Sequence, residues 1–264
     1  MLLKKLKLKQ FLIYAPPYNN GNRGGIVAMH YLCKVINEVG YEAYLHPATT
    51  RGDIITGGKM ADSKIDPAKC VGIYSEQIER PLEKNKVAVR WQMYYQLPHI
   101  KKYEGWDYVV NYVKAYWPQA PQLRVTMCNL AYWVPAPRMQ RKGNAGQYHK
   151  FPNVPIPKDC RLIDGIPNNH PTKLHTLQRA ERFYSADPYS FNNVLAALCG
   201  AESIIVPREG FNVDKWRAEV DAAPLLNYGD ADLIEGQREK AVQFVSDLHA
   251  KEREQVKEFC ETLQ

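Results

Sequence analysis

The sequence lacks the features that mark a membrane-spanning chain or a disulfide-linked secreted domain. No run of about 18 apolar residues occurs, so we expect no membrane-spanning helix. The six cysteines are scattered and form no C-x-x-C pair, which argues against disulfides and a structural zinc site. The basic N-terminal segment has no small-residue cleavage site, and we interpret it as a lead-in to a first strand rather than as a signal peptide. These absences together predict a cytoplasmic protein.

Several catalytic signatures are absent as well. There is no H-E-x-x-H pair, no P-loop, no G-x-S-x-G turn and no zinc-ligand spacing, which argues against zinc proteases, P-loop kinases and the usual serine hydrolases. Asp230-Ala231-Asp232 has the letters of a D-x-D motif, but it lies in a late polar stretch, and we discount it as a metal site. We therefore expect neither a metal ion nor a bound cofactor.

The composition allows one large domain or two small ones. The chain has 264 residues, of which 45% are hydrophobic, enough for a sizeable core. The formal net charge is +7, which suits nucleotides, nucleic acid or an anionic membrane surface without choosing among them. Part of the excess lies in the N-terminal tail, where plain solvation explains it. The oligomeric state cannot be predicted from these features.

Strand and helix patterns alternate along both halves of the chain. In the first half we expect strands over residues 11–15, 41–45, 70–74, 86–91, 108–112 and 124–127, and a helix over 26–39. In the second half we expect a weak strand over 161–164, helices over 173–180 and 191–199, strands over 182–185 and 203–207, and a long amphipathic helix over 236–264. The alternation predicts an α/β fold of two Rossmann-like, doubly wound domains, residues 1–134 and 135–264, that face a cleft.

The most informative segment reads as a strand, a polar turn, a helix and a second strand, over Arg179–Pro207. Its turn, Asp187–Asn193 (DPYSFNN), follows the first strand, and Ser190 is placed to cap the helix. Backbone N–H groups of such a turn at the carboxyl end of a strand can bind an anion. The alternative is a well-capped helix without a ligand, in which Asp187 only starts the turn.

Three further features carry candidate site residues. Asn19–Gly25 (NNGNRGG) follows a strand and opens a helix, but it is not the G-x-G-x-x-G fingerprint and can equally be an ordinary tight turn. The Arg141–Lys142 pair could clamp a diphosphate or be a solvated basic turn. Glu76 follows a strand, where a carboxylate can act as a general base, although a surface glutamate is the plainer interpretation. His30, inside the first predicted helix, is more simply a satisfied histidine.

Taken together, these segments resemble a GT-B glycosyltransferase of the retaining, polysaccharide-type group. The resemblance rests on four segments that together span much of residues 10–207. They are NNGNRGGIVAMHYLCKVINEVGYEAYL, VGIYSEQIERPLEKNKVAVRWQMYYQLP, RMQRKG and ERFYSADPYSFNNVLAALCGAESIIVP. The last is similar to the family's donor-site unit, which is written fysyD-x-x-T-x-x-x-x-E-A-x-x-x-G-x-x-v-v-v-P.

The resemblance implies metal-independent transfer of a sugar from a nucleotide-sugar donor, bound by the second domain, to an acceptor on the first. It assigns Arg141 and Lys142 to the diphosphate and places Gly24 and Gly25 near the phosphates or the transferred sugar. The remaining donor contacts are Asp187, Tyr189, Ser190, Phe191, Asn192 and Asn193. We expect Lys142, Arg23 and Glu76 to take part in catalysis, the last two on the acceptor side. The acceptor is a glycan or a modified nucleobase in DNA.

One position departs from the family pattern. Leu195 stands where the family has the glutamate that usually binds the donor ribose. Asn192 or Asn193 then supplies a substitute contact, or the donor sits differently. The alternative function is a non-catalytic relative that binds a nucleotide or nucleic acid.

Overall fold

The computed structural model describes residues 10–18, 24–93, 105–113, 119–126, 128–148, 151–166, 171–231 and 233–263. By its contacts the chain divides into two units: unit 1 comprises residues 1–127 and 248–264, and unit 2 comprises residues 128–247. The sequence-based division differs, because it placed one boundary at about residue 134 and gave the whole last helix to the second domain. An amphipathic pattern shows that a helix has an apolar face, but not which sheet covers that face.

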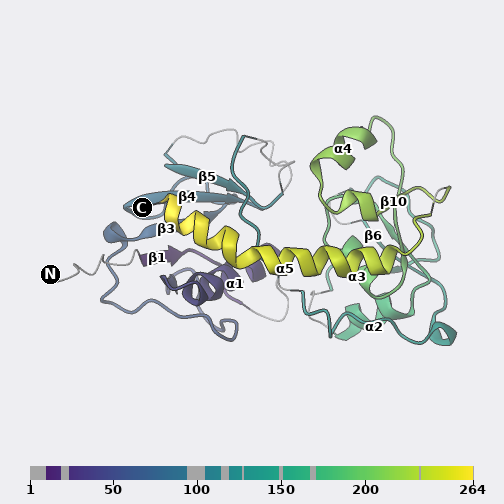
Figure 1. The fold of residues 1–264 in the computed structure, drawn as a ribbon, viewed down its shortest axis with the longest axis horizontal. Helices are drawn as coiled ribbons and strands as arrows, with labels where there is room; N and C mark the ends of the chain where they lie inside the picture. The colour runs from purple at the N-terminus through teal and green to yellow at the C-terminus, as the bar shows by residue number, and fades with distance from the viewer. Residues whose placement is uncertain are drawn as a thin grey trace. The chain divides into compact units, whose positions relative to one another are not determined.

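Unit 1 is built on a parallel sheet with the strand order β2-β1-β3-β4-β5 (Figure 1). The strands are β1 (Gln10–Ile13), β2 (Glu42–Leu45), β3 (Val71–Ser75), β4 (Val87–Gln92) and β5 (Tyr108–Asn111). Helix α1 (Gly24–Glu38) connects β1 to β2, and a short 3-10 helix, η1 (Pro67–Lys69), precedes β3. The continuous apolar runs of these strands fit a sheet that is covered on both faces.

The core of unit 1 lies on the two faces of this sheet. Phe11 and Ile13 point to one face, where they pack with α1 and with the end of α5 (Gln237–Thr262), the long last helix. Leu12 and Tyr14 point to the other face, where they pack with Tyr74. The period of two along β1 produces this division. The backbone N–H of Thr126 donates to the buried Glu252 of α5 at 2.6 Å, which ties the last helix to this unit.

Unit 2 has a second five-stranded parallel sheet, in the order β10-β9-β8-β6-β7. Its strands are β6 (Asn144–Gln147), β7 (Arg161–Leu162), β8 (Arg182–Ser185), β9 (Glu202–Ile205) and β10 (Asn227–Tyr228). Its helices are α2 (Pro171–Arg179), α3 (Asn192–Leu198), α4 (Val213–Glu219), η3 (Arg138–Gln140), η4 (Ala223–Leu225) and the first part of α5. Helix α3 packs against β8 and β9, and Figure 1 labels α2, α3, α4, β6 and β10 of this unit.

The predicted α/β class, with two parallel sheets and a long last helix, is confirmed. The strand expected over 124–127 is wrong for residues 124–126, which form no strand; residue 127 lies outside the described part of the chain. Strands β6 and β10 and helix α4 were not predicted from the sequence. Strand β6 has no β-branched residue, and its Gly146 is packed so tightly that a Cβ there would lie 2.7 Å from the Ile156 side chain.

Two further findings concern membrane-spanning helices and the cysteines. Within the described part of the chain, no helix is both long enough and apolar enough to cross a membrane. All six cysteines are free thiols. Burial raises the pKa of Cys128, Cys199 and Cys260 to about 12, so these thiols stay protonated at neutral pH.

Candidate functional sites at the two sheet edges

Each sheet has one point where the strand order reverses. In unit 1 the chain moves from β1 to β2 on one side and then to β3 on the other. In unit 2 it moves from β6 to β7 on one side and then to β8 on the other. Connections that leave two such neighbouring strands diverge, and ligands of parallel α/β sheets bind in the crevice at the carboxyl ends of those strands. The candidate sites are therefore expected after β1 and β3 in unit 1, and after β6 and β8 in unit 2.

The turn Asp187–Asn193 follows β8 at the switch point of unit 2. The centre of its polar network is Gln147, the last residue of β6, which is 1% exposed. The Gln147 amide nitrogen donates to Ser185 Oγ at 2.8 Å, and its amide oxygen accepts from Asn192 Nδ2 at 2.7 Å. Longer contacts of 3.4 Å join it to Ser190 and Asn193. Sequence reasoning missed Gln147 because it missed the strand that ends there.

Two residues of the turn lie beneath its surface. Asp187 is 0% exposed, and its carboxylate accepts from the backbone N–H of Tyr189 at 3.0 Å, which is an Asx-turn. Asn193 is equally buried and donates to the backbone oxygen of Asp187 at 2.9 Å. Both residues were predicted to contact the donor. Their burial indicates that they shape the turn instead.

The other predicted donor residues of the turn are accessible. Tyr189, Ser190, Phe191 and Asn192 are half-buried. Ser190 Oγ accepts from the backbone N–H of Asn192 at 3.3 Å, whereas Phe191, the residue directly before α3, makes no side-chain cap. A ligand at the turn therefore meets hydroxyl and amide groups that Gln147 already orients.

Leu195 is part of the hydrophobic core of unit 2. It lies in α3 and is 3% exposed. A glutamate, which the resemblance implies at this position, would be buried here, whereas leucine suits an apolar core.

The basic pair lies at the other edge of the sheet in unit 2. Arg141 and Lys142 precede β6, and the backbone N–H of Lys142 donates to Arg179 at the end of α2. The Arg141 guanidinium donates to the backbone oxygens of Gly200 and Ala136, so it caps the C-terminal end of α3. Because all five strands run parallel, this is the amino edge, and the structure does not bring the pair together with the turn. The assignment of Arg141 and Lys142 to one diphosphate site with the turn is therefore corrected.

In unit 1 the predicted residues lie at the switch point. Gly24 and Gly25 open α1 after β1, and Glu76 follows β3. Met93 joins them, because its backbone N–H donates to Glu76 Oε2 at 3.1 Å and its side chain lies 3.8 Å from the position of a Cβ on Gly25. Arg23 and most of the Asn19–Gly25 loop lie outside the described residues.

Glu76 is held firmly beside this edge. It is 4% exposed, and its backbone oxygen accepts from the buried guanidinium of Arg90 at 2.5 Å. That guanidinium also lies over the Trp106 ring, 5.7 Å from the ring centroid. A buried carboxylate in a rigid setting is suited to accept or deliver a proton at one defined position. The plainer interpretation of Glu76 as a surface residue is wrong.

His30 has a structural role. It is buried in α1, and its Nε2 lies 2.9 Å from the backbone oxygen of Pro16. Burial lowers the pKa of His30, so the neutral ring is favoured. It holds the segment that leads into the Gly-rich loop.

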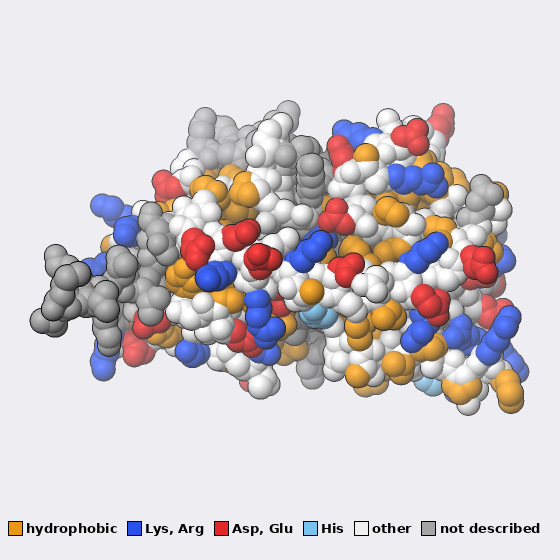
Figure 2. All heavy atoms as spheres, in the orientation of Figure 1, with side chains coloured by type: hydrophobic (Ala, Val, Ile, Leu, Met, Phe, Trp, Pro, Cys, Tyr) orange, Lys and Arg blue, Asp and Glu red, His pale blue; other side chains and the backbone are white. Residues whose placement is uncertain are grey.

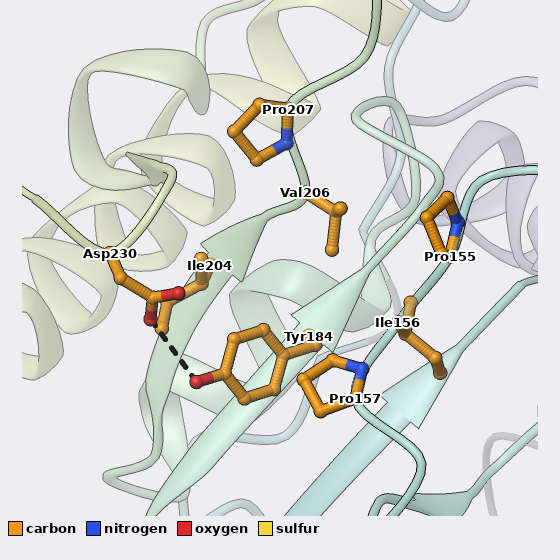
Figure 3. Close-up of a pocket in the computed structure, with 8 residues that line it drawn as sticks. All are labelled: Pro155, Ile156, Pro157, Tyr184, Ile204, Val206, Pro207 and Asp230. Atoms are coloured by element: carbon orange, nitrogen blue, oxygen red, sulfur yellow. Dashed lines mark hydrogen bonds between the residues drawn. The ribbon is translucent and has the colours of Figure 1, made fainter.

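A cavity of about 280 Å³ opens on one face of the sheet in unit 2 (Figure 3). Tyr184 lies at its centre and donates to Asp230 Oδ1 at 3.1 Å. Burial raises the pKa of Tyr184, which keeps the hydroxyl protonated. The lining residues are Pro155, Ile156, Pro157, Tyr184, Ile204, Val206, Pro207 and Asp230. Among the described residues, no group of three or more His, Cys, Asp or Glu side chains is placed to hold a metal ion.

Comparison with known proteins gives matches among solved structures. No protein-family model matches the sequence, and no curated protein matches it significantly. An alpha-glucosyltransferase in complex with UDP and a 13-mer DNA containing a HMU base has a TM-score of 0.48 and 10% identity, over 96% of this chain and 95% of that chain. An alpha-glucosyltransferase (AGT) in complex with UDP has a TM-score of 0.43 and 11% identity, over 95% of each chain. The forosaminyltransferase SpnP has a TM-score of 0.37 and 9% identity, over 97% of this chain and 95% of that one. All three are glycosyltransferases, and at these TM-scores the function of this chain must be argued from its own sites.

Proposed function

We propose that the chain is a glycosyltransferase that moves a sugar from a nucleotide-sugar donor to a base in DNA. The observation that carries the proposal is the position of the two candidate sites. Each parallel sheet has a polar site at its own switch point, Gln147 with the Ser190 turn in unit 2 and Glu76 with Gly25 in unit 1. Two such sites in one chain suit a reaction with two substrates.

In this proposal unit 2 binds the donor and unit 1 binds the acceptor. Ser190, Asn192 and the Tyr189–Phe191 pair contact the donor, because they are the accessible polar and aromatic side chains of the turn. The bond between the sugar and the diphosphate oxygen breaks, and its electron pair leaves with the nucleoside diphosphate. A new bond forms from the sugar to an acceptor hydroxyl, whose proton must be removed. We propose that side chains rather than a metal ion neutralise the departing charge.

The distribution of charge supports a polyanionic acceptor on unit 1. Unit 1 contains 21 of the 35 Lys and Arg residues but 14 of the 28 Asp and Glu residues, so it carries the whole net charge of +7, whereas unit 2 contains 14 of each. Four of these positive charges lie in the N-terminal tail, and the rest of unit 1 keeps an excess of three, 17 against 14. On the face shown in Figure 2 the basic and acidic side chains are interspersed rather than separated. An excess of cations confined to the acceptor unit fits DNA phosphates better than a neutral glycan.

Glu76 is the proposed acceptor-side proton acceptor if the reaction inverts the sugar configuration. Its burial and its rigid contacts with Met93 and Arg90 hold the carboxylate at one position. The family resemblance favours retention, in which case Glu76 orients the acceptor instead. Arg23 remains an acceptor-side candidate on sequence grounds.

Incubation of the chain with a panel of nucleotide sugars tests the proposal. We expect slow release of nucleoside diphosphate from one donor, and faster release when duplex DNA with hydroxyl-bearing bases is added. Binding to the same duplex in a gel shift should weaken steeply with salt. Faster release with a glycan and no DNA binding at low salt would replace DNA by a glycan acceptor.

A second candidate function is a non-catalytic module that recognises a nucleotide or nucleic acid. The observation that favours it is Leu195, which is buried in the core at the position of the family's ribose-binding glutamate. The donor panel separates the two functions, because a non-catalytic module binds a nucleotide but releases no nucleoside diphosphate from any donor.

A further inference from the structure

Arg208 follows β9 and lies over two aromatic rings. Its guanidinium carbon lies 4.1 Å from the centroid of the Phe151 ring and 4.4 Å from that of Phe211. Within the described residues, no hydrogen bond or ion pair of this side chain is found. A guanidinium that lies over an aromatic ring keeps its N–H groups in its own plane, where they can still form a planar fork toward a ligand.

One of the two rings near Arg208, Phe211, is linked to the donor turn through Trp216. Phe211 stacks on Tyr228 with the ring planes 15° apart and lies beside Trp216. The Tyr228 hydroxyl accepts from the backbone N–H of Arg208 at 3.2 Å. The indole N–H of Trp216 donates to the backbone oxygen of Pro188, inside the turn, at 3.2 Å. A continuous chain of contacts therefore joins the Arg208 guanidinium to the Asp187–Asn193 turn.

Basic side chains are scarce in the described part of the carboxyl edge of the unit 2 sheet. Among the described residues that follow the carboxyl ends of β6 to β10 by at most four positions, Arg208 is the one Lys or Arg. The acidic residues there include Asp164 and Asp230. Arg141 and Lys142, which the sequence suggested for a diphosphate, lie at the opposite edge. A dianionic group bound at the turn thus has Arg208 as its described cationic partner.

We propose that Arg208 binds the diphosphate of the donor and neutralises the charge that develops on it as the sugar leaves. The inference rests on the proposed function. It gives Arg208 the diphosphate contact that the sequence analysis gave to Arg141 and Lys142. The guanidinium forms charged hydrogen bonds to phosphate oxygens, and the two rings fix its plane before the ligand arrives. Pro207, the preceding residue, lines the cavity in Figure 3.

Calorimetric titration of the full chain with nucleoside diphosphates and with the matching nucleosides tests the inference. The variants are Arg208→Gln, which loses the charge, and Arg208→Lys, which keeps the charge but loses the fork. Arg217→Gln is the matched control, because Arg217 is exposed on α4 in the same unit. A urea unfolding curve for each variant shows whether it is folded.

We expect Arg208→Gln to lose about 10- to 100-fold in affinity for the diphosphate, with the affinity for the nucleoside unchanged. Arg208→Lys should fall between this variant and the wild type, and Arg217→Gln should match the wild type. Should Arg208→Gln not fold, the fall in Arg208→Lys carries the same conclusion.

A wild-type ratio of diphosphate to nucleoside affinity in both variants would overturn the inference and leave the proposed function standing. If Arg208→Gln loses duplex DNA binding at low salt but keeps its diphosphate affinity, the inference is also overturned, because Arg208 would then contact a phosphate of the acceptor. Failure of the wild-type chain to bind any nucleoside diphosphate would instead reject the donor site itself.

Discussion

Replacement of Gln147 by leucine should destabilise unit 2 and weaken donor binding together. The side chain is buried at the end of β6 and makes short hydrogen bonds to Ser185 at 2.8 Å and from Asn192 at 2.7 Å. Loss of two such bonds costs about 1 kcal/mol each, and the buried Asn193 oxygen left without this donor adds about 1–2 kcal/mol. Asn192 is half-buried and can turn to water, so we expect a total of about 2–4 kcal/mol.

Urea unfolding followed by circular dichroism measures this loss, and titration with the preferred nucleoside diphosphate measures the affinity. Gln243→Leu is the matched control, because Gln243 is exposed on α5 within the same unit and should change the unfolding free energy by less than about 0.5 kcal/mol. A Gln147→Leu variant as stable as this control would refute the network. A destabilised variant with unchanged affinity would show that the network does not organise the donor turn.

Other predictions follow from charges and burial. Arg141→Ala should lower the unfolding free energy by about 1–3 kcal/mol, because it leaves carbonyls at the end of α3 without their donor, yet calorimetry should show unchanged nucleotide affinity. Lys142→Ala should leave both quantities unchanged, and loss of transfer in that variant would restore the sequence-based assignment. Burial lowers the pKa of Lys173 to about 8, below the ordinary lysine value. Between these two pKa values the unfolded chain binds more protons than the folded chain, so the free energy of unfolding should rise with pH, and Lys173→Met should lack this rise. Burial raises the pKa of Glu252 above the ordinary glutamate value, so the free energy of unfolding should fall as the pH rises between these two pKa values. Glu252→Gln should lose that fall. Glu252→Ala should be destabilised, because the backbone N–H of Thr126 loses its acceptor.

The elements with strong periodicity were predictable from the sequence. Helix α1, strands β1 to β5 and the β8-α3-β9 unit follow apolar patterns that are local, so neighbouring residues suffice to identify them. The last helix was predictable as a helix, but its return to unit 1 depends on contacts such as that of Glu252 with Thr126, which no local pattern encodes. The same holds for the two candidate sites: contacts within one segment could be predicted from the sequence, and contacts between distant segments could not.

The missed strand β6 explains most of the error in the candidate site. Its sequence, Asn-Ala-Gly-Gln, is buried by neighbours rather than marked by β-branched residues, so nothing local indicated a strand. Recognition of β6 would have placed Arg141 and Lys142 at its amino end and Gln147 at its carboxyl end, which is the edge that binds ligands. Arg208 could not be recognised either, because Phe151 joins it from a distant part of the chain.

The central claim is tested most directly by the products of one reaction. The chain is incubated with each nucleotide sugar and with duplex DNA that carries hydroxyl-bearing bases, and the nucleoside diphosphate and the digested nucleosides are measured by mass spectrometry. The account predicts release of nucleoside diphosphate from one donor and an equal amount of a nucleoside heavier by one sugar residue. Folded protein that releases no nucleoside diphosphate from any donor, with DNA or glycan acceptors, would contradict it.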